Sequence, residues 1–361
     1  MASFAFVIHP LSPRDAARKY PIAAKIPEPI LEFGLRHLKP MVASRVTGIR
    51  SIAGPETDGW FIACPLTPKL MTEKLPLETV YRRIVRCAEI AAEQGAKIIG
   101  LGAFTSVVGD GGVTIAQRSP IPVTTGNSYT VATAIEGTLK ACEMLEADPD
   151  GMVLAIVGAT GSIGKTCARI LGPKFSRTIL IGRDLDRTRE LEAEVPNATA
   201  TNQILAAREA DVIITVTSSD AAVLLPEHLK PGCIVCDVAR PRDVSVRVSK
   251  ERPDVLVIEG GVVEVPGDVK FGIDFGFPER TAYACMSETM LLALEDRLEN
   301  FTLGKDVSVE QVQEMWRLAA KHGFRLAGFR SFEKAVTEES IERARRARKT
   351  LGAAVPRTVS A

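Results

Sequence analysis

The sequence predicts an α/β protein built from parallel strands with intervening helices, and three observations support that fold class. Five apolar runs of strand length lie between residues 152 and 261, separated by helical patterns. Regularly spaced glycines follow the first of these runs. The segment before residue 150 also alternates between apolar runs and amphipathic helices, although less regularly.

The length of 361 residues predicts about two domains. We expect a smaller α/β substrate domain at residues 1–150 and a nucleotide-binding domain at 151–265. Residues 266–361 are expected to add C-terminal helices and a basic tail. The polar, turn-rich stretch at 146–151 is the expected hinge.

The composition excludes several classes of protein. The 45 Lys and Arg side chains nearly balance 44 Asp and Glu, which does not predict a nucleic-acid-binding surface. Seven scattered cysteines indicate reduced thiols rather than a disulfide framework. No apolar run reaches the ~18 residues of a membrane span, and the N-terminal stretch lacks a basic signal-peptide region. We therefore expect a cytoplasmic protein without membrane insertion.

The central region predicts a doubly wound parallel sheet. Its apolar runs are rich in β-branched residues, which is typical of strands that are buried on both faces. The five expected strands are 152–158, 177–183, 211–218, 233–239 and 255–261. Helices are expected after the first two of them.

Apolar spacing and turn residues also predict the elements before residue 150 and after residue 261. An apolar face spaced for a helix runs from residue 77 to Gly95, and strands are expected at 96–106 and 121–127. Ser128 is the expected cap of the next helix. After residue 261 we expect a helix whose first turn includes Pro278, then one that ends at Gly323, then a basic C-terminal helix.

The stretch VGATGSIGKT resembles a dinucleotide-binding loop. Gly158, Gly161 and Gly164 lie between a strand and a helix, where glycine lets the backbone approach a pyrophosphate at the helix N-terminus. A phosphate-binding P-loop needs four residues between its first glycine and its Gly-Lys pair, whereas five separate Gly158 from Gly164. The pattern therefore predicts a Rossmann-type domain.

Arg183, at the end of the second strand, favours NADP(H), because a guanidinium suits a 2′-phosphate. The alternative is that Asp184 holds the ribose hydroxyls of NAD. Later strand ends are expected to complete the site. The full set of expected cofactor contacts is Gly158, Thr160, Gly161, Ser162, Ile163, Gly164, Arg183, Thr217, Ser218, Gly260 and Gly261.

The sequence predicts no metal site. Cys233 and Cys236 form a C-x-x-C inside an expected strand, where that spacing points the side chains to opposite faces. There is no second cysteine pair to complete a zinc site.

Two chemistries fit a hydride carrier: direct reduction of a ketone with a proton donor, or reduction of a thioester through a cysteine. Several segments in order, among them LGAFTS, TTGNSYT, VGATGSIG, EGGVVE and PERTAYACMSETMLLALE, resemble the long-chain acyl-[acyl-carrier-protein] reductases, which form fatty aldehydes. The resemblance covers most of the chain, from residue 9 to about 324. It is loose at 265–280, which leaves the acyl chain length open.

The resemblance implies that Cys285 carries the acyl group, that NADPH supplies hydride, and that the substrate is a thioester of acyl carrier protein or coenzyme A. A downstream aldehyde-consuming enzyme would then be a partner. Ser106 and Asn127 follow expected strands and are candidates to hydrogen-bond the thioester oxygen. The alternative for both is a structural role in turns or helix caps.

Other interpretations remain open. Cys285 has the properties of a small apolar residue that fills a helix interface. A dehydrogenase of the shikimate type would need a Lys–Asp pair, for which Lys97 and Asp110 are the candidates. A non-catalytic NADP(H)-binding protein is the third reading.

Overall fold

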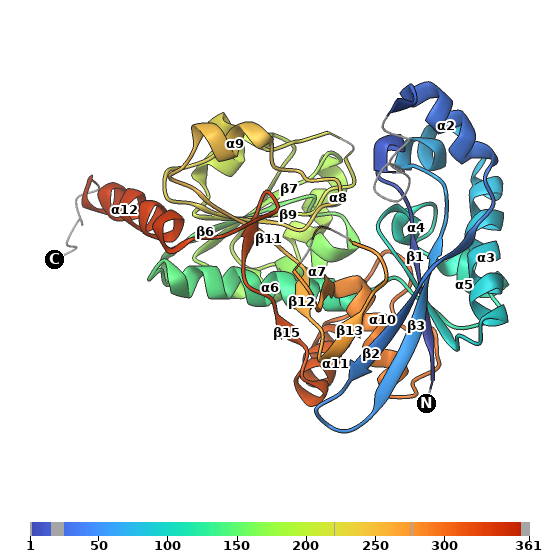
Figure 1. Ribbon diagram of the computed structural model, residues 1–361. Coiled ribbons are helices and arrows are strands. Elements are labelled where there is room, and N and C mark those ends of the chain that lie inside the picture. The colour runs from blue at the N-terminus through green and yellow to red at the C-terminus, as the bar shows by residue number, and fades with distance from the viewer. Residues whose placement is uncertain (1, 16–24, 220, 275, 277, 355–361) are drawn as a thin grey trace. The chain divides into compact units, whose positions relative to one another are not determined.

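The computed structural model describes residues 2–15, 25–219, 221–274, 276 and 278–354 (Figure 1). The chain forms two compact units. Unit 1 consists of Met1–Ala132 and Val262–Ala327, and unit 2 consists of Thr133–Gly261 and Gly328–Ala361. Both units are thus built from segments that are distant in sequence, whereas the sequence analysis expected three consecutive regions.

Unit 1 contains a mixed six-stranded sheet and the helices around it. Its strands are β1 (Phe4–Ile8), β2 (Met41–Arg50), β3 (Glu56–Ala63), β4 (Ile98–Leu101), β5 (Val123–Thr124) and β13 (Gly267–Lys270). Its helices are α2 (Glu28–His37), α3 (Leu77–Glu93), α4 (Phe104–Val107), α5 (Val113–Arg118), the start of α6 (Asn127–Met144), α10 (Ala284–Leu294) and α11 (Val309–His322). Three short strands, β12 (Val262–Glu264), β14 (Thr281–Tyr283) and β15 (Arg325–Leu326), form a separate small sheet.

The order of the larger sheet is β13-β2-β3-β1-β4-β5. Strands β3, β1, β4 and β5 are parallel, while β2 and β13 are antiparallel additions. The carboxyl ends of four neighbouring strands therefore meet at one edge, where parallel α/β sheets bind ligands.

Helices cover both faces of the unit 1 sheet. The apolar stripe of α3 packs against the face formed by Ala5, Val7 and Ile99. The other face receives α10, which contacts β4 and β1. A Cβ atom on Gly100 would lie 2.1 Å from Thr289 Oγ1, so only glycine permits this approach of α10 to β4.

Unit 2 contains a fully parallel sheet of six strands. These are β6 (Val153–Val157), β7 (Arg177–Ile181), β8 (Ala198–Thr201), β9 (Val212–Thr215), β10 (Ile234–Asp237) and β11 (Leu256–Glu259). The helices are the end of α6, α7 (Ser162–Leu171), α8 (Leu185–Glu192), α9 (Val246–Glu251) and α12 (Glu338–Ala354), and a small hairpin joins β16 (Arg330–Ser331) to β17 (Lys334–Ala335).

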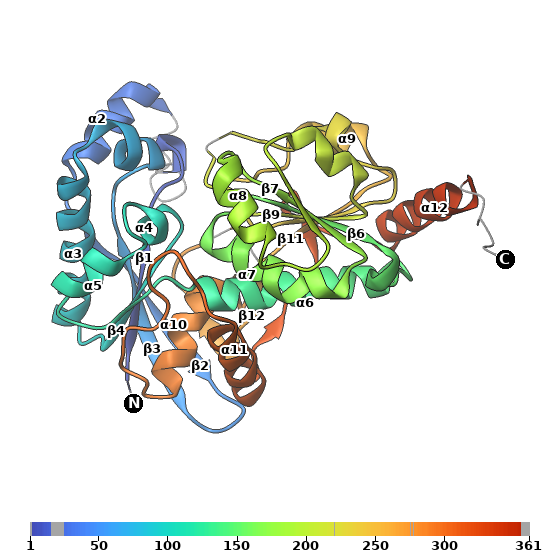
Figure 2. The ribbon, with the colours of Figure 1, turned by 180° about the vertical axis from the view of Figure 1, so that it is seen from behind.

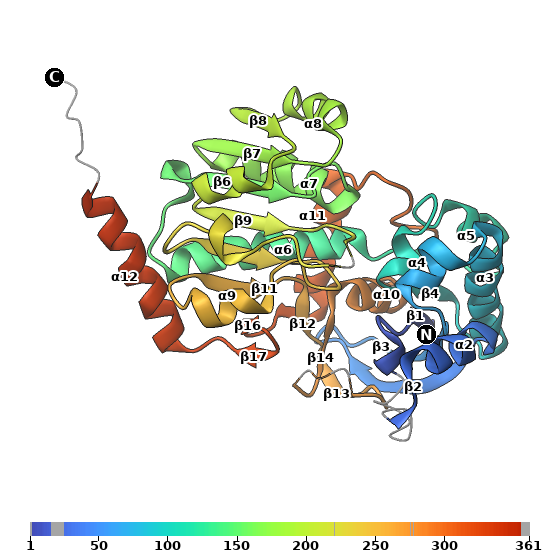
Figure 3. The same ribbon diagram turned by 90° about the horizontal axis from the view of Figure 1, so that it is seen from above.

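The strands of this sheet lie in the order β11-β10-β9-β6-β7-β8, and most of them can be followed in this spatial order in Figure 3. The chain enters at β6, moves outward to β8 and returns to β9 on the other side of β6. This is the Rossmann order, with its switch point between β6 and β9. The predicted fold class, a Rossmann-type doubly wound sheet plus a second α/β domain completed by C-terminal helices, is confirmed.

Helices also cover both faces of the unit 2 sheet. Figures 1 and 2 show α6 and α7 on one side of its strands and α9 on the other. The α9 side holds an apolar cluster that includes Val157, Ile213 and Val235. On the other side, the thiol of Cys236 lies 3.9 Å from the Ala134 carbonyl of α6.

The basic helix α12 is attached to the rest of unit 2 by ion pairs and hydrogen bonds. Arg348 lies 3.3 Å from Asp211, Lys349 lies 3.0 Å from Glu146, and Arg345 donates to the Met144 carbonyl at 2.6 Å. These cations are therefore occupied by contacts inside unit 2. The predicted tail at 355–361 lies outside the described residues.

All five strands predicted for the central region are present. The short edge strand β8 was not predicted, because its alternating Ala and Thr residues carry no apolar signal. Two local predictions were wrong. Residues 281–283 form β14, paired with β12, so the next helix begins at Ala284 and not near Pro278. Ser128 lies inside the first turn of α6 and donates its hydroxyl to Glu288 instead of capping the helix.

Candidate functional site

Two groups of predicted residues lie at the carboxyl edges of the two sheets, one group in each unit. The group in unit 1 contains the predicted catalytic residues Ser106, Asn127 and Cys285. The segment after β4 carries Ser106 in the short helix α4, and the loop after β5 leads into α6 at Asn127. Since β4 and β5 are parallel neighbours, these two loops lie at the same sheet edge.

Cys285 is brought to this loop by a backbone contact. It is the second residue of α10, and a Cβ atom on Gly126 would lie 2.3 Å from its Cα atom. Gly126 also has a φ of +74°, which other residues rarely adopt. The first turn of α10 therefore lies against the backbone that immediately precedes Asn127.

Cys285 differs from the other six cysteines in exposure. All six of the others are buried, whereas Cys285 is partly accessible. Burial raises the pKa of five of these thiols, to about 11 for Cys142 and about 12 for Cys233 and Cys236; Cys87 and Cys167 are the other two. Cys285 instead occupies a helix N-terminus, where the peptide dipoles favour a thiolate.

Ser106 and Asn127 are both buried, with 5% of each residue exposed. The Ser106 hydroxyl donates to the Ala103 carbonyl at 2.6 Å, so it would have to leave that acceptor before donating to a substrate. Asn127 begins α6 directly after Gly126. Of the two residues, only Asn127 is a sequence neighbour of Gly126, whose backbone contacts Cys285.

His9 follows β1, whose parallel neighbours are β3 and β4. Its Nε2 atom accepts the Phe104 N–H at 3.0 Å, which leaves Nδ1 to donate to the Pro10 carbonyl at 3.1 Å. Although part of the residue is accessible, desolvation lowers its pKa to about 4. His9 is consequently a neutral ring near neutral pH that supports the turn containing Ser106, and its one N–H is used by the Pro10 carbonyl.

Glu288, which the sequence analysis did not single out, is completely buried beneath Cys285 on α10. Its carboxylate accepts hydrogen bonds from the hydroxyls of Thr124, Ser128 and Thr302 and from the backbone N–H of Tyr129. The signal that was available is a single carboxylate in an otherwise apolar helix, because a buried charge requires several donors.

Two other residues near Cys285 in sequence, Arg280 and Phe271, contact partners elsewhere in unit 1. Arg280 has a φ of +62° and pairs with Glu264 at 3.2 Å, with both side chains about half exposed. Of the aromatic residues before it, Phe271 packs 6.0 Å from Phe61 between ring centroids. Phe275 and Phe277 lie outside the described residues.

The glycine-rich loop of unit 2 has the geometry of a dinucleotide-binding turn. Gly158 has a φ of +85°, and a Cβ atom on Gly164 would lie 2.3 Å from the Gly158 carbonyl oxygen. Gly161 is different, because a Cβ atom there would lie 3.4 Å from its nearest neighbour, the Gly158 carbonyl oxygen, which is an ordinary contact distance. Two glycines are thus required for the fold of the loop, and the third leaves its outer surface open where α7 begins.

Arg183 and Asp184 follow β7 and have different surroundings. The Asp184 carboxylate accepts the Arg187 N–H at 3.2 Å and caps α8. Arg183 is exposed and precedes this cap. The alternative in which Asp184 binds the ribose of NAD therefore competes with its capping role.

The loop after β9, which contains Thr217 and Ser218, is fixed by the buried Asp243. The Asp243 carboxylate accepts the hydroxyls of Thr215 and Thr217 and the Thr217 N–H, at 2.5–2.8 Å. Desolvation raises the pKa of Asp243, and it raises that of neighbouring Asp237 to about 6. These carboxylates organise the carboxyl edge at β9 and β10.

Gly260 and Gly261 follow β11 at the same edge. A Cβ atom on Gly260 would lie 2.8 Å from Val238 and 2.9 Å from the Cys236 sulfur, while Gly261 has a φ of +82°. All eleven predicted cofactor residues therefore follow the carboxyl ends of unit 2 strands or begin α7. Rossmann-type sheets bind dinucleotides at this edge of their strands.

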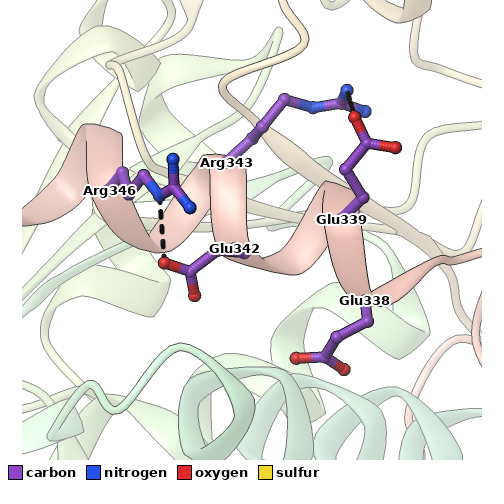
Figure 4. A pocket seen from close by; sticks show the side chains of 5 residues that line it. All are labelled: Glu338, Glu339, Glu342, Arg343 and Arg346. Atoms are coloured by element: carbon purple, nitrogen blue, oxygen red, sulfur yellow. Dashed lines mark hydrogen bonds and ion pairs between the residues drawn. The ribbon is translucent and has the colours of Figure 1, made fainter.

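Two further features do not form sites. Within the described ranges, no group of three or more His, Cys, Asp or Glu side chains is placed to hold a metal ion. Figure 4 shows a charged hollow on α12, where Arg343 pairs with Glu339 and Arg346 with Glu342 along one helix. Exposed pairs of this kind contribute little to stability.

No helix in the described parts of the chain has both the length and the apolar character needed to cross a membrane.

Comparisons with known proteins agree with the Rossmann-type unit. The family model for shikimate / quinate 5-dehydrogenase matches residues 143–259. The chain is 33% identical over 271 residues to the aminotransferase PigE of Serratia sp., a match that covers 73% of this chain but 32% of PigE. It is also 28% identical over 300 residues to a long-chain acyl-[acyl-carrier-protein] reductase of Synechococcus elongatus, covering 79% of this chain and 87% of that protein.

Solved structures show weaker similarity. L-tryptophan dehydrogenase from Nostoc punctiforme aligns with 98% of this chain and 90% of its own at 12% identity, with a TM-score of 0.41. Glutamyl-tRNA reductase from Methanopyrus kandleri aligns with 77% of this chain and 57% of its own at 14% identity, with a TM-score of 0.32. Scores this low carry no argument about function. The sequence matches and the unit 2 loop support an NAD(P)-dependent oxidoreductase.

The role of His9 predicts its titration. NMR of the ring should give a midpoint near 4 rather than 6.5, because desolvation disfavours the imidazolium. Since the folded pKa lies below the unfolded one, stability should fall as the pH drops from about 6.5 towards 4. His9→Gln should lessen this loss in urea unfolding, and a wild-type midpoint near 6.5 would contradict the assignment.

The glycine loop predicts different outcomes for two similar substitutions. Gly161→Ala should keep the melting temperature but weaken cofactor binding about tenfold or more, because the new methyl group projects where the pyrophosphate approaches. Gly164→Ala should lower the melting temperature, because its methyl group meets the Gly158 carbonyl. Equal behaviour of the two variants in calorimetry and nucleotide titration would show that the loop does not work in this way.

Proposed function

We propose that the protein reduces a long-chain acyl thioester to an aldehyde with NADPH, through an acyl group carried on Cys285. The observation that carries the proposal is the setting of this thiol. It is partly accessible, it lies in the first turn of α10, and it faces the Gly126–Asn127 loop at the ligand-binding edge of unit 1. The other six cysteines are buried. The similarity to a long-chain acyl-[acyl-carrier-protein] reductase supports the same substrate class.

The proposed reaction begins with attack by the Cys285 thiolate on the thioester carbonyl. The bond from the acyl carbon to the carrier sulfur breaks, and the carrier leaves as a thiol after gaining a proton. NADPH supplies a hydride to the acyl carbon. The resulting thiohemiacetal then releases the aldehyde, and Cys285 returns as a thiolate.

The groups at the sheet edge have definable tasks in this reaction. The helix dipole of α10 stabilises the attacking and departing thiolate. Asn127 is the proposed hydrogen-bond donor to the carbonyl oxygen as charge develops there, because it directly follows the Gly126 contact with Cys285. Because His9 is neutral with both ring nitrogens engaged, solvent is the proposed source of protons.

NADPH rather than NADH is the proposed hydride source. Arg183 is exposed at the end of β7, where a 2′-phosphate would lie, and Asp184 is occupied as the cap of α8. Thr217 and Ser218, in the loop fixed by Asp243, and Gly260 and Gly261 are the proposed contacts towards the nicotinamide.

The carrier of the acyl group is proposed to be acyl carrier protein or coenzyme A. One helix offers Arg82, Arg83 and Arg86, but Arg83 bonds the Arg36 and Leu38 carbonyls and Arg86 pairs with Glu89 and Glu93. The charge of Arg86 is therefore offset by carboxylates, whereas Arg82 and Arg83 bond only neutral groups in these contacts and keep their positive charge. An aldehyde product would be the substrate of a downstream aldehyde-consuming enzyme. The relative PigE, of which this chain spans about one third, is named an aminotransferase.

A dehydrogenase mechanism of the shikimate type is less well supported. Lys97 precedes β4 at the amino edge of the sheet, where it is exposed. Asp110 lies beyond the carboxyl end of the same strand and bonds Thr114 at the start of α5. A proton-transfer pair would require both groups at one edge. A non-catalytic NADP(H)-binding protein leaves the exposure of Cys285 unexplained.

The proposal predicts the effect of Cys285→Ser. Aldehyde formation should fall by a factor of about 1,000 or more, because a serine hydroxyl is not ionised at neutral pH. NADPH binding, measured by fluorescence titration, should be unchanged, since the cofactor residues lie in unit 2. Cys142→Ser, which changes a buried thiol in unit 2, is the matched control and should retain activity. Aldehyde formation by Cys285→Ser at the wild-type rate would refute the covalent route.

The role of Arg183 predicts a change in cofactor preference. Arg183→Ala should raise the Kd of NADPH about tenfold or more and leave that of NADH nearly unchanged, because only NADPH carries the 2′-phosphate. Lys250→Ala, which removes an exposed cation from α9, should alter neither value. Parallel loss of both nucleotides in Arg183→Ala would mean that the arginine does not select the phosphate.

A further inference from the structure

We infer that Glu288 is a positioning residue that holds Cys285 and the Asn127 loop together as one rigid element. The inference rests on the proposed role of Cys285 and adds a group that neither the comparisons nor the sequence motifs assign. Glu288 lies three residues after Cys285, so both side chains project from neighbouring positions on the same side of α10.

The hydrogen bonds of Glu288 come from two segments far away in sequence. One oxygen, Oε2, accepts the Ser128 hydroxyl at 2.6 Å and the Tyr129 N–H at 2.9 Å, both in the first turn of α6. The other oxygen, Oε1, accepts the hydroxyls of Thr124, at the end of β5, and Thr302, beyond α10. Four donors therefore hold a carboxylate that has no exposed surface.

Further bonds join the donors to one another. The Thr302 N–H donates to the Thr124 hydroxyl oxygen at 3.3 Å, and the Thr302 carbonyl accepts both the N–H and the hydroxyl of Thr125. Asn127 lies between Thr125 and Ser128 in the chain. The loop that carries Asn127 is thus bonded to α10 on both sides of Gly126, at the point where the backbone meets Cys285.

This arrangement fits a positioning role better than acid–base chemistry. All four donors point at the carboxylate, and its completely buried position gives it no path to solvent. A misplacement of about 1 Å between reacting groups can lower a rate by about two orders of magnitude. A carboxylate that fixes the distance between the thiol and the loop would act on the rate of acyl transfer and reduction without contacting the substrate.

Glutamine is the informative conservative replacement. Its oxygen can still accept from Ser128 and Tyr129, while its amide group donates to the Thr124 and Thr302 hydroxyls after these rotate. Glu288→Gln therefore keeps the connection and removes the charge, whereas Glu288→Ala removes both. The matched control is Glu295→Gln at the C-terminal end of the same helix, where Glu295 bonds Lys321 and His322.

The test measures kcat and KM for aldehyde formation by purified full-length variants. We expect Glu288→Ala to lower kcat about tenfold or more with KM within about threefold, and Glu288→Gln to recover most of that loss. Glu295→Gln should keep kcat even where it lowers the melting temperature. Wild-type kcat in Glu288→Ala would overturn the inference, and so would equal losses in Glu288→Gln and Glu288→Ala, which would indicate proton transfer.

A second variant, Thr302→Val, tests the inference if Glu288→Ala does not fold. A second measurement, amide hydrogen exchange, tests it independently of the proposed reaction. Thr302→Val removes one donor without changing any charge, so it should lower kcat about threefold; an unchanged kcat would count against the inference. Amide hydrogen exchange needs no substrate. In Thr302→Val, residues 123–130 and 284–290 should exchange faster together, while 309–322 should not. If the wild type forms no aldehyde, the proposed function fails, and unchanged exchange in both segments would separately overturn the connection.

Discussion

The close approach of the Gly126 backbone to the first turn of α10 is the constraint on which the catalytic account depends. A side chain at residue 126 would overlap the Cα atom of Cys285, so the loop and the helix can meet only through glycine. That contact leaves Cys285 at the carboxyl edge of the sheet, in the first turn of α10. The Glu288 hydrogen bonds act in the same place and resist separation of the two segments.

In unit 2, glycines and a buried carboxylate likewise shape the loops that carry the predicted cofactor contacts. Its sheet places six strand ends at one edge, and the loops there are shaped by glycines at 158, 164 and 261 and by the buried carboxylate of Asp243. The chemistry is thus divided, with the predicted nucleophile in one unit and the predicted cofactor contacts in the other. Along the chain, unit 1 ends and unit 2 begins within α6, after Ala132, and the chain returns to unit 1 after Gly261.

The sequence was most informative where one local pattern has one physical cause. Continuous β-branched runs predicted the five central strands, and the glycine spacing predicted the turn before α7. The helix start at Pro278 was wrong because pairing of residues 281–283 with β12 outweighs the local preference for a first-turn proline. The role of Glu288 could not be predicted, because its four donors lie up to 164 residues away in sequence and are gathered by the tertiary fold. Likewise, nothing local distinguished Cys285 by exposure from six buried thiols.

The most direct measurement is intact mass spectrometry of the full-length protein mixed with a long-chain acyl thioester in the absence of NADPH. If Cys285 carries the acyl group, the protein should gain the mass of one acyl group, located on Cys285 by peptide mapping and removed when NADPH is added. A protein that stays unmodified while it forms aldehyde with NADPH, or an acyl group on another residue, would contradict the account.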